Sequence, residues 1–139
     1  MKFNKKLSEI VDISKIEAVK KPIEKAHGLP NECYLNEDYL KLEREKIFQN
    51  NWTMIGVASS VPNPGDVKPF NLLGIPILII RNKDNEVKVF HNVCSHRGFK
   101  LIDKECKLKN VLRCPYHYWS YDFKGNLVAT PHIGGLGKH

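Results

Sequence analysis

Two pairs of cysteine and histidine constrain this chain more than any other feature of its sequence. The first pair is Cys94-x-His96, the second is Cys114-x-x-His117, and 17 residues separate His96 from Cys114. Thiolate sulfur and imidazole nitrogen are both common metal ligands in proteins. The sequence therefore predicts a metal centre that joins two separate segments of the chain.

The way the ligands are divided between the two pairs discriminates between zinc and iron–sulfur. A Cys2His2 zinc finger places both cysteines together and both histidines on a helix at H-x3-5-H spacing. Here each segment supplies one cysteine and one histidine, and no helix is predicted after Cys114. A [2Fe–2S] centre with two cysteines on one iron and two histidines on the other needs this division. The spacing favours iron–sulfur, and zinc stays as the alternative.

The composition fits one globular domain that is not bound to a membrane. The chain has 139 residues, of which 42% are hydrophobic and 27% charged, as in ordinary folded domains. The longest apolar stretch, Leu72–Ile80, is far shorter than the roughly 20 residues needed to span a bilayer. The N-terminus lacks the apolar segment of a signal peptide. We therefore expect a cytoplasmic location.

The remaining cysteines and histidines lack the spacing of metal ligands. Cys33 and Cys106 have no Cys or His at ligand distance in the sequence, and structural disulfides are rare in cytoplasmic proteins. We expect both to be free thiols. The histidines without ligand spacing to the centre are His27, His132 and His139.

The net charge of +7, from 22 basic and 15 acidic residues, leaves two interpretations open. A basic domain can bind nucleic acid or recruit an acidic protein. The lysines are spread along the chain, and no run of basic residues alternates with aromatic residues. A lysine-rich solvated surface is the simpler interpretation, and we expect no nucleic-acid partner.

Hydrophobic periodicity predicts a helical N-terminal extension over residues 1–50 and a β-domain over 51–139. Asn36 is a good N-cap, with two carboxylates in the turn that follows it, and predicts a helix over about 37–49. A short helix is also possible around Leu7–Lys20, where apolar residues recur at helical spacing.

The β-domain is predicted to consist of many short antiparallel strands. Alternating and β-branched residues favour strands in "WTMIGVA", "IPILIIRN", "VKVFHNV" and "VLRC", and two further strands in "WSYDFKGNLVA" joined at Lys124–Gly125–Asn126. Each Cys/His pair directly follows one of these strands. Two loops at the same end of a sheet can clamp one metal centre between them.

The segments "CSHRG" and "CPYHYWSYDFKGNL" resemble the motif of Rieske [2Fe–2S] proteins. The wider stretches "YLNEDYLKLEREKIFQNNW", "VPNPGD" and "GIPILIIRN" look like the N-terminal half of the α-subunit of Rieske non-heme iron oxygenases. These oxidoreductases are ring-hydroxylating, demethylating or amine-hydroxylating enzymes. The resemblance covers roughly residues 29–135. It implies a mainly β fold, a Rieske-type antiparallel β-sandwich or barrel with cluster-binding loops.

The resemblance also implies a role for each motif residue. Cys94 and Cys114 would hold the inner iron of a Rieske [2Fe–2S] cluster, and His96 and His117 the outer, redox-active iron. Tyr121 matches the motif tyrosine whose hydroxyl can hydrogen-bond a cysteine sulfur and raise the potential.

At other motif positions the chain looks like the low-potential, oxygenase type of Rieske protein. Trp119 stands where respiratory Rieske proteins carry a hydrogen-bonding serine, and it could equally be a core aromatic. Phe99 and Tyr116 stand where those proteins have two further cysteines that form a disulfide. Arg97 could serve docking beside the cluster or be a surface cation. Tyr118 departs from the family, because a small residue is commoner there.

The resemblance implies electron transfer without catalysis by this chain alone. Family α-subunits continue into a catalytic domain with a mononuclear non-heme Fe(II), held by two histidines and a carboxylate, and no such triad follows Trp119 before His139. The implied partners are a ferredoxin or flavin reductase and, in the full-length protein, further copies in a homo-oligomer, a trimer by family resemblance. The alternatives are a stand-alone Rieske ferredoxin and a zinc-binding interaction module.

Overall fold

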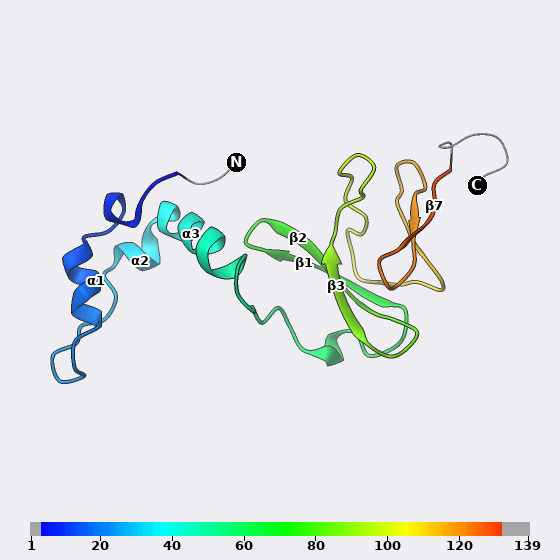
Figure 1. The fold of residues 1–139 in the computed structure, drawn as a ribbon. Coiled ribbons are helices and arrows are strands. Elements are labelled where there is room, and N and C mark those ends of the chain that lie inside the picture. Colours follow the sequence, from blue (N-terminus) through cyan, green and yellow to red (C-terminus); the bar gives the residue numbers. More distant parts are fainter. Residues whose placement is uncertain (1–3, 132–139) are drawn as a thin grey trace. The chain divides into compact units, whose positions relative to one another are not determined.

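The structure of the protein is a computed structural model that describes residues 4–131 (Figure 1). His132 and His139 lie outside these residues, as does the end of the predicted β-domain. The chain divides into two compact units, Met1–Met54 and Ile55–His139. Helices occupy the first unit and strands the second.

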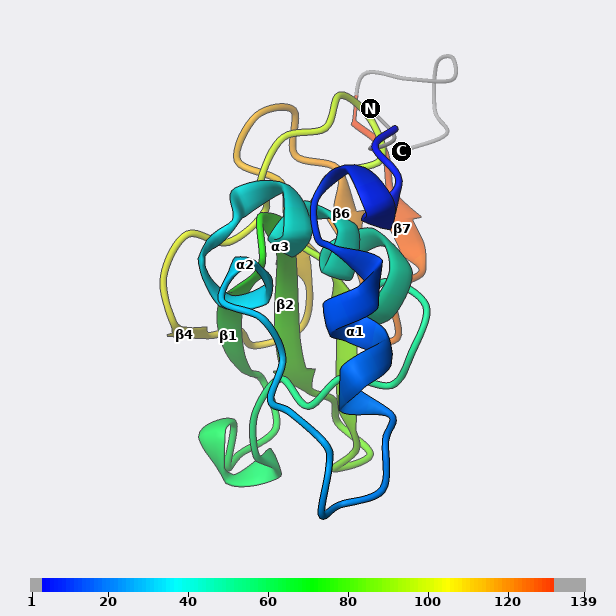
Figure 2. The ribbon, with the colours of Figure 1, turned by 90° about the vertical axis from the view of Figure 1, so that its left-hand side faces the viewer.

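Short helices build the first unit, and α1, α2 and α3 face the viewer in Figure 2. The predicted helix around Leu7–Lys20 is divided at Asp12, which accepts a hydrogen bond from the Ser14 N–H at 2.9 Å and caps a new helix. A short helix between residues 30 and 36 was not predicted. The elements are η1 (Leu7–Glu9), α1 (Ile13–Val19), α2 (Glu32–Leu35), α3 (Glu37–Glu43) and the π-helical segment η2 (Arg44–Phe48).

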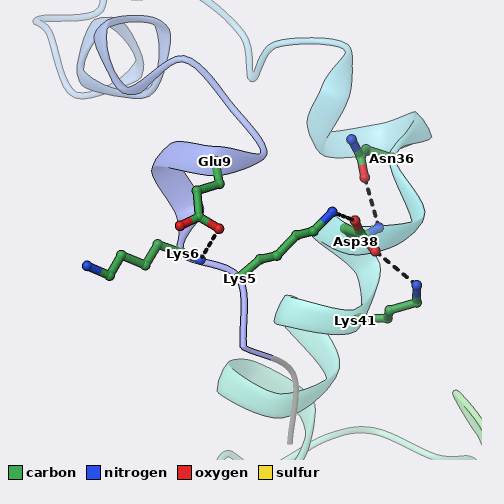
Figure 3. A network of polar contacts seen from close by, with 6 residues as sticks. All are labelled: Lys5, Lys6, Glu9, Asn36, Asp38 and Lys41. Carbon is green, nitrogen blue, oxygen red and sulfur yellow. Dashed lines mark hydrogen bonds and ion pairs between the residues drawn. The ribbon is translucent and has the colours of Figure 1, made fainter.

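The predicted N-cap at Asn36 is confirmed. Its side chain accepts a hydrogen bond from the Asp38 N–H at 2.8 Å, at the start of α3 (Figure 3). The Asp38 carboxylate also pairs with Lys5 and Lys41 (Figure 3). These two ammonium groups, Lys5 first, lower the pKa of Asp38. The network joins residues far apart in the sequence and fixes where α3 begins.

The larger sheet of the second unit is antiparallel, with the strand order β3-β2-β1-β4. Its central strand β2 has four successive buried residues, Ile77 to Ile80, so both of its faces are covered. Figure 2 shows β4 at the outer edge beside β1. The bounds are β1 (Asp66–Leu72), β2 (Ile75–Arg81), β3 (Val87–His91) and β4 (Cys106–Lys107).

The smaller sheet has the order β5-β6-β7 and is also antiparallel. The turn between β6 and β7 is where the sequence predicts it, and Gly125 adopts φ +90 there. A Cβ atom at Gly125 would lie 2.7 Å from the Phe90 ring, so this turn requires glycine. The bounds are β5 (Leu112–Arg113), β6 (Ser120–Tyr121) and β7 (Leu127–Ala129).

Three features of the β-domain differ from the sequence prediction. The segment "WTMIGVA" is not a strand: residues 52–57 have no regular structure, and η3 (Ala58–Ser60) is a 3-10 turn. Trp52 and Met54 are exposed, so the apolar pattern that suggested a strand buries no face. Conversely, β1, which contains Pro69, and β4 are strands that the sequence analysis did not predict. That proline lies opposite Leu78 of β2 and beyond the two residues that pair with β4.

A single apolar cluster occupies the interior of the second unit and includes Cys94 and Cys114. Both candidate sulfur ligands are therefore part of the core rather than of an open surface loop. In residues 4–131, no helix is long and apolar enough to cross a membrane. The other buried members of the cluster are Val67, Leu78, Ile80, Leu101, Leu112 and Phe123.

Candidate metal centre

Buried Asn92 fixes the segment that leads into the first Cys/His pair. Its backbone N–H donates to the Pro76 carbonyl at 2.9 Å, just after the end of β3. Its side-chain oxygen accepts from the N–H groups of Leu101 and Ile102, at 3.1 and 2.9 Å, and its amide donates to the Ile102 carbonyl at 2.6 Å. The side chain is fully buried. Asn92 thus closes the base of the loop that carries Cys94.

The first ligand loop is closed by two backbone hydrogen bonds at its cysteine. The Cys94 N–H donates to the Phe99 carbonyl at 2.7 Å, and the Gly98 N–H donates to the Cys94 carbonyl at 2.9 Å. Gly98 adopts φ +67, a conformation that side chains with a Cβ rarely take. The loop therefore turns back on itself within five residues of the ligand.

The second ligand loop repeats this hydrogen-bond pattern. The Cys114 N–H donates to the Trp119 carbonyl at 2.8 Å, and the Tyr118 N–H donates to the Cys114 carbonyl at 3.0 Å. Tyr118 adopts φ +62 and occupies the position that Gly98 has in the first loop. Tyr118 was noted in the sequence because the family commonly has a small residue there. The backbone at this position adopts a conformation that glycine prefers. A non-glycine residue in the left-handed region stores strain of order 1 kcal/mol.

Substituting glycine for Tyr118 is expected to stabilise the protein, because glycine adopts the left-handed conformation without a Cβ clash. The matched control is Tyr118→Ala, which removes the same ring but keeps the Cβ. We expect Tyr118→Gly to be more stable than Tyr118→Ala by about 1 kcal/mol in urea unfolding followed by circular dichroism. Equal stability of the two variants would show that the backbone at residue 118 is not strained.

The structure brings all four candidate ligands together as two like pairs. Cys94 and Cys114 are each 2% exposed, and the Cys114 thiol is one of the groups that lower the pKa of Cys94. The rings of His96 and His117 lie 4.9 Å apart in an edge-on arrangement. Among residues 4–131, no three His, Cys, Asp or Glu side chains converge as ligands of a single ion. A two-iron cluster with two sulfur and two imidazole ligands fits this arrangement.

The hydroxyl of Tyr121 lies within hydrogen-bonding distance of the first sulfur. It is 3.3 Å from Cys94 Sγ, 3.0 Å from the Ser95 backbone nitrogen and 2.8 Å from Ser95 Oγ. Burial, and then the hydrogen bond with Cys94, raise the pKa of Tyr121. The contact with Cys94 is the one that the sequence motif implies. Ser95 was not singled out from the sequence, and its only signal there is a hydroxyl residue directly after a candidate ligand.

The environment of Cys94 favours the thiolate that a metal requires. Burial alone raises the pKa of this thiol, but hydrogen bonds outweigh it, and the net pKa lies below the ordinary value. The first of them comes from the Tyr121 hydroxyl. The others come from the backbone N–H of His96, the Cys114 thiol and the backbone N–H of Arg97. Arg97 thus contributes its backbone at this site, while its side chain is exposed.

Aromatic rings surround the two imidazoles. Trp119 stacks on His96, with ring centres 4.7 Å apart and planes 8° from parallel. Tyr116 lies 3.7 Å from the ring of His117 and 5.5 Å from the ring of Phe99. Phe99 and Tyr116 are the positions at which respiratory Rieske proteins have a disulfide, and here a ring contact joins the two loops. Trp119 packs against a candidate ligand as well as against the core.

Known proteins are similar to this chain over the residues that form the candidate site. The family described as the Rieske [2Fe-2S] domain matches residues 51–138, which include both Cys/His pairs. The carnitine monooxygenase oxygenase subunit of Escherichia coli (strain K12) is 34% identical over 105 residues, 76% of this chain and 28% of that protein. The chlorobenzene dioxygenase subunit alpha of Cupriavidus sp. (strain PS12) is 33% identical over 108 residues, 78% of this chain and 24% of that protein.

Solved structures show the same similarity. The apo form of the quaternary ammonium Rieske monooxygenase CntA matches with a TM-score of 0.68 and 35% identity, over 74% of this chain and 30% of that one. Naphthalene 1,2-dioxygenase matches with a TM-score of 0.64 and 28% identity, over 71% and 22%. The chain therefore spans less than a third of the length of these relatives. Since the family match covers more than half of its residues, this chain belongs to the Rieske [2Fe-2S] domain family, whose cofactor is a two-iron, two-sulfide cluster.

Proposed function

We propose that this chain carries single electrons through a Rieske [2Fe–2S] cluster, with Cys94 and Cys114 on one iron and His96 and His117 on the other. The observation that carries the proposal is the sorting of the four side chains, two sulfurs together in the core and two imidazoles together beside them. The cluster supplies one-electron chemistry. The protein supplies the ligands, a hydrogen bond to sulfur and buried positions for both cysteines.

The exposure of the ligands supports a direction for electron transfer. Both cysteines are buried, whereas His96 and His117 are partly exposed. The imidazoles are therefore the ligands nearest the surface, and electrons enter and leave on their side. The exposed rings of Phe99, Tyr116 and Tyr118 lie next to the ligands in the two loops. These residues would meet any redox partner that approaches the imidazoles.

The wider proposal is an oxygenase α-subunit. We propose that residues 51–139 are its Rieske domain and that residues 1–50, with their helix over about 37–49, are an N-terminal extension. The support is that the relatives are named as oxygenase or dioxygenase subunits. A mononuclear non-heme Fe(II) would then belong to a catalytic domain outside this chain. The coding sequence after His139 tests this, because the proposal requires two histidines and a carboxylate there.

Partners and location follow from the same proposal. A ferredoxin or flavin reductase would supply the electrons. The full-length protein would assemble as a homo-oligomer, and specifically as a trimer. Inter-subunit electron transfer is described for a related quaternary ammonium Rieske monooxygenase, which supports an oligomer. None of the four cysteines, all of which lie in the described part of the chain, forms a disulfide. This agrees with a cytoplasmic location.

The purified protein is expected to be red-brown and to hold two irons and two acid-labile sulfides per chain. Its reduced form should give the electron paramagnetic resonance signal of low average g value that accompanies mixed histidine and cysteine ligation. Metal analysis and spectroscopy of the same sample check both statements. A colourless protein loaded with zinc would overturn the proposal and favour an interaction module.

A further inference from the structure

Ser95 makes two contacts with the hydroxyl of Tyr121, a residue 26 positions later in the chain. Its backbone nitrogen lies 3.0 Å and its Oγ 2.8 Å from that oxygen. The same oxygen lies 3.3 Å from Cys94 Sγ. Three groups of two neighbouring residues thus surround one phenolic oxygen.

Counting donors shows how these contacts are directed. The Tyr121 hydroxyl has one hydrogen to give and two lone pairs to receive. The Ser95 backbone N–H can only donate, and a Cys94 thiolate that binds metal can only accept. The Tyr121 hydrogen therefore goes either to Cys94 Sγ or to Ser95 Oγ. A charged sulfur accepts more strongly than a neutral hydroxyl, so the sulfur receives it and Ser95 Oγ donates to Tyr121.

We propose that Ser95 is a positioning residue, which aims the single O–H of Tyr121 at Cys94 Sγ and thereby raises the reduction potential of the cluster. The inference rests on the proposed function, because it assumes that Cys94 is a cluster ligand. Both donors of Ser95 occupy the lone pairs of the Tyr121 oxygen. This fixes the direction of its hydrogen and makes the O–H a stronger donor, since hydrogen bonds in a chain polarise one another.

The effect on potential follows from charge. Reduction adds one electron to the cluster, so a hydrogen bond to a ligand sulfur stabilises the reduced form more than the oxidised form. The O–H bond of Tyr121 stays intact throughout, and no proton is transferred.

The second ligand loop offers no equivalent of Ser95. The residue that follows Cys114 is Pro115, which has neither a backbone N–H nor a hydroxyl. The two loops share their backbone hydrogen-bond pattern at the cysteine, yet only the first can supply both donors to Tyr121. The serine side chain is on an exposed residue, so core packing does not explain its orientation.

The test compares midpoint potentials of the cluster-loaded protein by protein-film voltammetry. Ser95→Ala is expected to lower the potential, by less than Tyr121→Phe does. Ser95→Thr keeps the hydroxyl and should therefore keep the original potential. Ser59→Ala, at an exposed serine outside the ligand loops, should also leave the potential unchanged. In the Tyr121→Phe background, Ser95→Ala should have no further effect, because the hydroxyl through which it acts is gone.

Other outcomes separate this inference from the proposed function. A potential that rises in Ser95→Ala would mean that Ser95 competes with the sulfur for the Tyr121 hydrogen, and would overturn the inference alone. An unchanged potential, or an effect that persists in the Tyr121→Phe background, would do the same. If Ser95→Ala loads poorly, Ser95→Gly gives the same comparison. An original protein that binds no cluster would overturn both proposals.

Discussion

Serine in place of Cys94 is expected to abolish incorporation of the iron–sulfur cluster. The side chain is buried in the core, and a serine hydroxyl is a hard, protonated donor where a soft thiolate is required. Cys114→Ser, His96→Ala and His117→Ala should each have the same result. The measurement is the visible absorption and the iron content of the purified variants. The two ligand loops should also become susceptible to proteolysis, because metal binding and local folding are coupled.

Two cysteines in the same chain provide the matched control. Cys106 lies exposed in β4 and Cys33 lies in α2, and neither belongs to the ligand loops. Cys106→Ser and Cys33→Ser should keep the full absorption spectrum and iron content. Loss of the cluster in Cys106→Ser would mean that the ligands have been assigned wrongly.

Alanine in place of Asn92 is expected to destabilise the protein. Among the substitutions proposed above at residues other than the candidate ligands, none is expected to have a larger effect on stability. The change leaves the buried N–H of Leu101, and the partly buried N–H and carbonyl of Ile102, without their present partner. A buried polar group without a partner costs about 1 to 3 kcal/mol. We expect a loss of about 3 to 5 kcal/mol, a large part of the stability of an ordinary domain.

Urea unfolding of the variants measures this loss, with Asn110→Ala as the control. Asn110 is exposed, where its side chain accepts a hydrogen bond from Lys83, and its removal should change the unfolding free energy by less than about 0.5 kcal/mol. Asn92→Asp should be at least as damaging as Asn92→Ala, because it loses the amide donor and places a charge in the interior. A small effect of Asn92→Ala would show that water readily replaces the amide.

The features that the sequence predicted correctly are those that depend on residues close together in the chain. The hairpin of β2 and β3, the turn at Gly125 and the cap at Asn36 each lie where the sequence predicts them. A cap or a tight turn is decided by a few successive residues, through their side-chain oxygens and backbone preferences. The same holds for the spacing within each Cys/His pair, which indicated a metal centre before any fold was known. Which side chains bind the cluster remains a prediction.

The apolar pattern predicted strands less accurately where a strand depends on pairing with a separate segment. "WTMIGVA" looks like a strand but has none of the ladder partners that a strand needs, whereas β1 looks irregular and is a strand because β2 pairs with it over six residues. Strand formation depends on a partner segment as much as on propensity. A single sequence shows the propensity and not the partner.

The tertiary structure alone decided how the candidate site is supported. The sequence does not reveal that Tyr118 takes the place of Gly98, because that equivalence lies in the hydrogen bonds of two separate loops. Nor does it reveal that Asn92 is buried and hydrogen-bonded to Leu101 and Ile102, or that Ser95 reaches Tyr121. The contact of Ser95 with Tyr121 joins segments that come together only when the sheets fold. The chain thus encodes the chemistry of its ligands locally, and the packing of distant segments determines their hydrogen bonds and exposure.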